Sequence, residues 1–190
     1  MYIKKQLLDY TADVAQCVVK SDFEKLAAIV QRLTQVKIEG KTVYTAGNGG
    51  SATTASHLCN DLVKGCRVNE REGIKAVCLS DSNAVITCLA NDYSYDEIFS
   101  IQLKTYAVKG DVLVVFSGSG NSPNIIEALK TAREMGIDTI GFSGRDGGKM
   151  KDLCDLLLIA PAGLMEKIED MHLMYEHAMI CTIKELLIQI

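Results

Sequence analysis

The stretch with the clearest chemical potential is a glycine-rich run at residues 46–51 (AGNGGS), between a short β-like segment at 42–45 and a helix-forming pattern at 52–64. Glycine lets the backbone approach a ligand closely and adopt positive φ angles. A helix start adds unpaired N–H groups at the positive end of the helix dipole. We therefore predict an anion site, most often for phosphate, made by Asn48, Gly49, Gly50 and Ser51. The alternative is a tight strand-to-helix connection that binds no ligand.

A second polar turn repeats this arrangement at residues 117–122 (SGSGNS), after the apolar run 111–116. Pro123 follows at a favoured first helical position, and residues 124–135 have a helical pattern. Neither turn has the G-K-[ST] ending of a Walker loop, and the first lacks the third glycine of a dinucleotide-binding fingerprint. Two turns of this kind could converge on one phosphorylated ligand.

The chain has three histidines, and carboxylates accompany two of them. Asp61 follows His57 by four residues, so the pair shares a helix face and could bind a metal, or the carboxylate could tune the imidazole. The last predicted helix carries Glu169, His172 and His177. Glu169 and His177 are eight residues apart, about 12 Å along a helix axis, so they could face one cleft although joint ligation of one ion would be stretched. The alternative for each residue is a structural role.

Composition narrows the class of protein. The 190 residues, 48% of them hydrophobic, predict one globular domain, and the formal charge of −4 argues against nucleic acid binding through a broad basic surface. No apolar run approaches the roughly 20 residues of a membrane span, and we recognise no signal peptide before the first helix. The seven cysteines form no C-x-x-C pair, which favours core thiols in a reduced cytoplasm.

The elements that would position these residues alternate between strand and helix. Strands are expected at 42–46, 74–79, 112–116, 139–142 and 156–159, and helices at 2–19, from 21, 52–64, 82–89, 96–106, 124–135 and 165–187. Central strands that are apolar on both faces indicate a parallel sheet covered by helices on both sides, an α/β fold in three layers. Such sheets bind ligands beyond the carboxyl ends of the strands, where both polar turns lie.

Two helices precede the first strand, which is more than a small sheet needs to cover itself. The second begins at a capping-box sequence, residues 21–24 (SDFE), and is predicted to bury Phe23, Leu26, Ala27, Val30 and Leu33. These apolar faces could pack on the domain or on another subunit. We expect residues 1–36 to be a helical pair for oligomer packing within a single domain, residues 1–190.

Taken together, these segments resemble the sugar isomerase (SIS) domain family, in its phosphoheptose isomerase branch. The matching segments are 47–51, His57, 91–92, 117–122, 147–150 and 168–172. The resemblance implies a five-stranded, flavodoxin-like sheet, a homotetramer with active sites between subunits, and an aldose–ketose isomerase. The implied reaction converts sedoheptulose 7-phosphate to D-glycero-D-manno-heptose 7-phosphate.

The resemblance also implies roles for individual residues. Ser51, Ser117, Ser119 and Ser122 fall where the family holds the sugar phosphate, and Asp92 matches a further active-site position.

A metal site follows from the same resemblance, with one divalent ion, zinc first, per active site. Its ligands would be His57, Asp61, Glu169 and His177, with Glu169 also near the substrate. Asp61 would be the base that moves a proton between C1 and C2, and His177 the acid on the opposite side.

Four departures from the family keep alternatives open: Asp61 replaces Glu, Glu169 replaces Gln, Gly118 replaces Thr, and Gly65 replaces Arg. The protein could isomerise another sugar phosphate. It could also be a non-catalytic SIS protein that binds a phosphosugar or a protein partner, as relatives that contact the bacterial replication initiator do. The carboxylate retained at Asp61 favours an enzyme.

Overall fold

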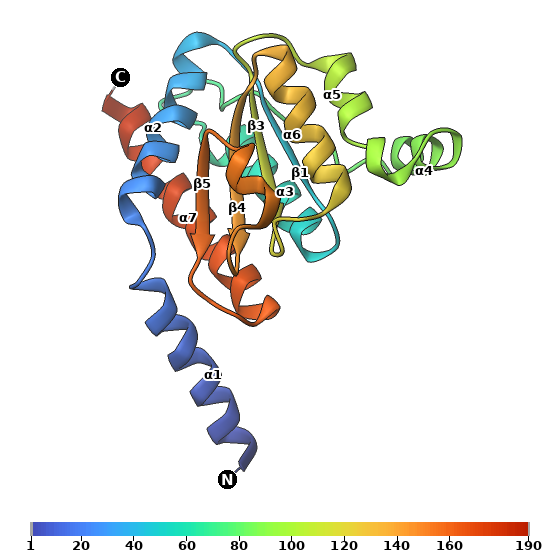
Figure 1. Ribbon diagram of the computed structural model, residues 1–190. Coiled ribbons are helices and arrows are strands. Elements are labelled where there is room, and N and C mark those ends of the chain that lie inside the picture. Colours follow the sequence, from blue (N-terminus) through green and yellow to red (C-terminus); the bar gives the residue numbers. More distant parts are fainter. Residues whose placement is uncertain (1, 190) are drawn as a thin grey trace.

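The computed structural model describes residues 2–189 and contains a sheet of five parallel strands (Figure 1). Its order is β2-β1-β3-β4-β5, which confirms the predicted flavodoxin-like arrangement. The strands are β1 (Val43–Gly47), β2 (Ala76–Cys78), β3 (Val112–Ser117), β4 (Asp138–Gly144) and β5 (Leu156–Ala160).

Helices cover both faces of this sheet, as the sequence predicts. They are α1 (Tyr2–Val18), α2 (Phe23–Glu39), α3 (Gly50–Asn60), α4 (Asn83–Asp92), α5 (Ser100–Tyr106), α6 (Pro123–Met135) and α7 (Met165–Gln189). Short helical turns add η1 (Asp61–Gly65), η2 (Tyr95–Glu97) and η3 (Gly148–Asp152).

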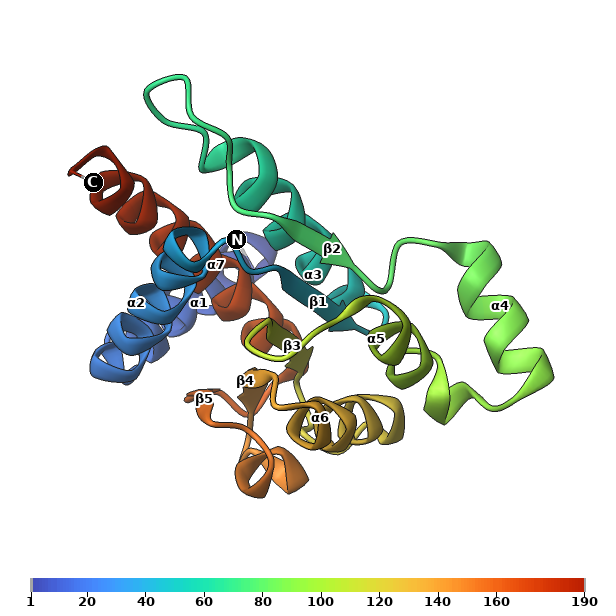
Figure 2. The same cartoon turned by 90° about the horizontal axis from the view of Figure 1, so that it is seen from above.

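The alternation of side chains along β3 shows how the layers form. Val112, Val114 and Phe116 join the core under α2, α3 and α7, whereas Leu113 and Val115 join the core under α5 and α6. Successive residues of a strand point to opposite faces, so a wholly apolar strand must be buried on both sides. The view from above shows the same three layers (Figure 2).

The segment after the first glycine turn differs from the single helix that we predicted over 52–64. The α-helix ends at Asn60, and η1 is a π-helical turn in which the Cys66 N–H donates to the Asp61 carbonyl at 2.9 Å. The N–H of Ile74 donates to the Leu62 carbonyl in this turn at 2.8 Å. Ile74 is thereby held outside the sheet, which explains why β2 is shorter than expected.

The N-terminal helices are less buried than the rest of the fold. The Asp22 side chain caps α2 by accepting from the Lys25 N–H, one residue after the Ser21 that heads the predicted capping box. Phe23 is 52% exposed rather than buried, and Ala27 is exposed as well. Phe23 lies on the first turn of α2, where the described chain offers little to cover it. α1 extends away from the body in Figure 1, and Val14 is the one buried residue of this helix, all of which lies in the described part of the chain.

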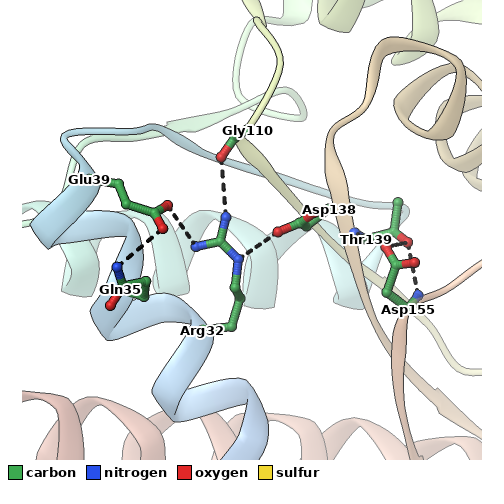
Figure 3. Close-up of polar contacts among 7 residues, drawn as sticks. All are labelled: Arg32, Gln35, Glu39, Gly110, Asp138, Thr139 and Asp155. Atoms are coloured by element: carbon green, nitrogen blue, oxygen red, sulfur yellow. Dashed lines mark hydrogen bonds and ion pairs between the residues drawn. The ribbon is translucent and has the colours of Figure 1, made fainter.

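A paired polar network joins the helices to the amino ends of the strands (Figure 3). Arg32 of α2 donates to the Asp138 carboxylate at 2.6 Å and to the Gly110 carbonyl at 3.2 Å. The Asp155 carboxylate accepts from both the backbone N–H and the hydroxyl of Thr139. These contacts fix α2 and β5 against β4.

Across residues 2–189, each helix is too short or too polar to cross a membrane.

Candidate active site

The two polar turns lie side by side because the strands before them are neighbours. β1 pairs with β3 in a register that matches Gly47 with Phe116, so both turns leave the sheet at the same edge. Asn48 and Asn124 then join them, since each side-chain amide donates to the other's oxygen, at 2.8 and 2.9 Å. The Tyr95 hydroxyl also donates to Asn48, at 3.0 Å. The predicted convergence of the two turns is therefore present within one chain.

The first turn has a backbone that demands glycine. Gly49 precedes α3 with φ of +56°, a region that favours glycine, and a Cβ on Gly47 would collide with the backbone of Ser51. Helix α3 starts at Gly50, so its first N–H groups face the end of the turn. Asn48, Gly49, Gly50 and Ser51 thus surround a helix N-terminus, the arrangement expected for a phosphate site.

The second turn gathers the predicted serine hydroxyls. Ser117 and Ser122 have their hydroxyl oxygens 3.1 Å apart, and the Ser119 hydroxyl accepts from the Asn121 N–H at 3.2 Å. A side chain at Gly118 would collide with the Met165 sulfur at the start of α7. This packing accounts for glycine at position 118, where the resemblance leads to a threonine.

The predicted acid–base and metal residues also meet. His57, Asp61 and His177 lie in a group with Glu176, with one potential ligand atom of each within 4.8 Å of the others. The Nε2 atoms of His57 and His177 are 3.4 Å apart, and His57 Nε2 is 3.8 Å from an oxygen of Asp61. Helix α3 and the π-turn supply two members, and α7 supplies the other two.

Glu176 is the least solvated member of this group. It is 0% exposed, and within residues 2–189 neither carboxylate oxygen has a hydrogen-bond partner. Burial, followed by the nearby Asp61 carboxylate, raises the pKa of Glu176 to about 8. The two imidazoles and two carboxyl groups could together hold a metal ion.

Glu169 does not join the other three predicted metal ligands. Its carboxylate lies against Gly50, where an added Cβ would be 2.6 Å from Oε2. The eight residues that separate it from His177 carry it about 12 Å along α7, to the level of the glycine turn. Glu169 therefore lies at the first glycine turn, and Glu176 is the α7 carboxylate that lies with His57, Asp61 and His177.

Two other candidates lie apart from this group. Asp92 ends α4 in an exposed position, and its contacts are with Asn91 and Cys88 of the same helix. His172 is buried, with Nε2 3.1 Å from the Ser143 carbonyl oxygen, and burial lowers its pKa to about 4. A neutral, hydrogen-bonded imidazole of this kind holds α7 against β4.

Sequence reasoning missed Asn124 and Tyr95, and it did not single out Glu176 among the acidic residues of the last helix. Asn124 had a usable signal in its position directly after the second turn. Glu176 is one of several acidic residues in α7, and only its burial distinguishes it.

Comparisons with known proteins agree with this geometry. The chain belongs to the SIS domain family, whose model matches residues 6–144. It is 38% identical to the phosphoheptose isomerase of Aliarcobacter butzleri, over 95% of this chain and 94% of that protein. It is 41% identical to the phosphoheptose isomerase of Clostridium acetobutylicum, over 85% of this chain and 82% of that protein. The resemblance found in the sequence is confirmed.

A solved structure gives the same result at the level of the fold. The phosphoheptose isomerase GmhA from Neisseria gonorrhoeae superposes with a TM-score of 0.89 at 30% identity, covering 96% of this chain and 99% of that one.

Proposed function

We propose that this protein is a phosphosugar aldose–ketose isomerase that converts sedoheptulose 7-phosphate to D-glycero-D-manno-heptose 7-phosphate. The observation that carries the proposal is the meeting of His57, Asp61 and His177 between α7 and the helical segment that begins at the first polar turn. The phosphoheptose isomerases similar to this chain support the choice of substrate.

The two turns would bind the phosphate of the sugar. The N–H groups at the start of α3 and the hydroxyls of Ser51, Ser117, Ser119 and Ser122 are donors suited to an anion. His57 follows Gly50 by seven residues, about 10 Å along the helix, which leaves space for several carbons between the phosphate and the reacting end. Glu169, beside Gly50, would accept hydrogen bonds from sugar hydroxyls between the two ends. Asp92 would complete the site from α4.

Asp61 and His177 would carry the proton transfers. Asp61, as a carboxylate, would take the proton from C1 and return it to C2 of the resulting enediol. His177 would donate to the carbonyl oxygen on the other side and recover the proton from the neighbouring hydroxyl. The 3.4 Å separation between His177 and His57 nitrogens would keep the acid oriented toward this end of the site.

The cluster has the donor chemistry of a divalent cation site. Imidazole nitrogens and carboxylate oxygens suit zinc, and the buried, unpaired oxygens of Glu176 are atoms that a cation would satisfy. A divalent ion, zinc in the first instance, held by His57, Asp61 and His177 would polarise the substrate carbonyl and hold its hydroxyl groups.

We propose in addition that the protein is a homotetramer with active sites between subunits, and that residues 1–36 make part of the contact. α1 exposes Tyr2, Ile3, Leu7 and Leu8, each by more than half. Between α1 and α7 is a groove of about 380 Å³ that ends at His177. A Leu7→Glu variant should reduce the mass measured by light scattering from four chains to fewer. An unchanged mass would contradict the proposed role of α1 in the subunit contact.

We propose that the protein works in the cytoplasm, and its cysteines support this. All seven are free thiols in the structure, which supports a reducing cytoplasm.

The isomerase proposal is tested by following sedoheptulose 7-phosphate in D₂O with the zinc-loaded protein by proton NMR. Deuterium should enter at C1, and aldose signals should appear. Asp61→Ala should abolish both. If the zinc-loaded protein gives no exchange with this sugar, the substrate assignment is wrong. Exchange with another ketose phosphate would then keep the isomerase class, and silence with all of them would favour a binding protein.

A further inference from the structure

Glu176 is a buried acidic residue that the proton transfers above do not use. It sits on α7 directly before His177, is 0% exposed, and lacks a hydrogen-bond donor for either oxygen among residues 2–189. A buried carboxylate without donors is costly, because it has lost its water without gaining a partner. Structures retain such groups mainly where a ligand completes them.

The neighbours of Glu176 suggest the nature of that ligand. The four-residue group contributes two imidazoles and two carboxyl groups, with ligand atoms within 4.8 Å of one another. Ligands arranged tetrahedrally around zinc at 2.0–2.2 Å lie about 3.3–3.6 Å apart. The separation of 3.4 Å between the His57 and His177 nitrogens already falls in this range.

The backbone supports the same arrangement. Asp61 is the first residue of the π-turn, whose Asp61 carbonyl bonds to Cys66 five residues on. A π-turn widens the helix by one residue and is found frequently at functional sites. Here it places Asp61 toward α7 and Glu176.

We propose that Glu176 is a metal ligand, and that it completes a site of two histidines and two carboxylates with His57, Asp61 and His177. This inference rests on the metal site of the proposed function and changes its ligand set. Glu169, beside Gly50, is left free to bind the sugar. The preferred ion is a divalent cation that accepts both imidazole and carboxylate, such as zinc.

The first test measures zinc binding to metal-free protein by calorimetry at pH 7. Wild type should bind one zinc per chain. Glu176→Gln and Glu176→Leu should each weaken the affinity at least tenfold, since even outer partners of metal ligands contribute about 10- to 100-fold. Glu169→Gln and Glu185→Gln are the matched controls on the same helix, the latter exposed, and should stay within threefold of wild type. The proposal is overturned if Glu176→Leu binds zinc as wild type does, or if Glu169→Gln alone loses affinity.

Thermal unfolding provides a readout that does not depend on catalysis. Without metal, Glu176→Leu should raise the melting temperature, because it removes a buried unpaired carboxyl group. With saturating zinc, the rise in melting temperature should be smaller than in wild type, since stabilisation follows the affinity for the folded state. A lower melting temperature in the metal-free variant, together with an undiminished rise on zinc addition, would make Glu176 a structural acid and contradict the proposal.

These results are independent of the identity of the sugar. Zinc affinity that depends on Glu176 in a protein inactive toward sedoheptulose 7-phosphate would refute the substrate assignment and keep the ligand set. If Glu176→Leu keeps both its turnover and its zinc affinity, the proposed ligand set is refuted and the isomerase assignment is kept.

Discussion

Two buried carboxylates, Asp111 and Glu176, have opposite environments. Asp111 is 2% exposed and accepts from the N–H of Thr42 at 3.0 Å and of Val108 at 2.9 Å. Glu176 is 0% exposed and, within residues 2–189, accepts from no group. The Asp111 carboxylate is hydrogen-bonded by the fold, whereas the Glu176 carboxyl group is left without a hydrogen-bond partner and is our proposed metal ligand.

The same contrast separates the two regions in which these residues lie. Around Asp111, at the amino ends of the strands, Arg32, Asp138 and Asp155 are all paired (Figure 3). Around Glu176, the imidazoles of His57 and His177 face each other, with their Nε2 atoms 3.4 Å apart. The polar groups at the amino ends of the strands therefore stabilise the fold, whereas the unpaired Glu176 lies in the candidate metal site.

The largest expected effect comes from Asp61→Asn. Loss of the proposed base should reduce kcat/KM for sedoheptulose 7-phosphate by about 10²- to 10⁴-fold, because general base catalysis contributes on that scale. The melting temperature should hold or rise, since the repulsion between Asp61 and Glu176 is removed. A steady-state isomerase assay and a thermal melt measure the two effects.

Asp138→Asn is the matched control for Asp61→Asn, in the paired region. It should lower stability slightly through its contact with Arg32 and leave kcat/KM within about twofold. Equal losses of activity in both variants would erase the functional distinction between the two regions.

The next effect is on stability. Asp111→Ala leaves the part-buried N–H groups of Thr42 and Val108 without this acceptor and should reduce the free energy of unfolding by about 2 kcal/mol. Urea denaturation measures it, with metal-free Glu176→Leu run in parallel. The two substitutions should move the midpoint in opposite directions, and movement in the same direction would contradict the contrast between the carboxylates.

His172 adds a pH-dependent version of the comparison, because it is buried and paired only in its neutral form. Its pKa is lowered from 6.5 to about 4 in the folded protein, so below pH 6.5 the unfolded chain takes up a proton that the folded chain excludes. The contribution of neutral His172 to the free energy of unfolding is fully present above pH 6.5. It falls by about 2 kcal/mol between pH 6.5 and 5. Urea midpoints across this range should fall less steeply in His172→Gln, and parallel curves would show that another group is responsible.

The smallest effect is expected for Arg32→Met. The side chain is partly exposed, and its pairs with Asp138 and Glu39 should contribute only about 1 kcal/mol to stability. Activity and zinc affinity should equal those of wild type. A change in either would show that the amino-end network reaches the site, and denaturation with calorimetry would detect it.

Much of the fold could be predicted because its signals are local. Apolar runs located the strands, the capping sequence at 21–24, Ser82 and Gly136 marked helix ends to within a residue, and the two glycine turns identified the edge of the sheet where the candidate phosphate site lies. Interactions within a few residues determine turns and caps, and hydrophobic periodicity determines which faces must be buried.

The sequence by itself therefore determined the class of sheet, the two turns and three members of the cluster, His57, Asp61 and His177. The tertiary structure decided which α7 glutamate lies with these three, since only the packing of α3 against α7 leaves Glu169 at the glycine turn and buries Glu176 beside them. It also decided the π-turn at Asp61 and the exposure of Phe23. The physical reason is that burial and pairing arise from contacts between distant segments, which no local spacing records.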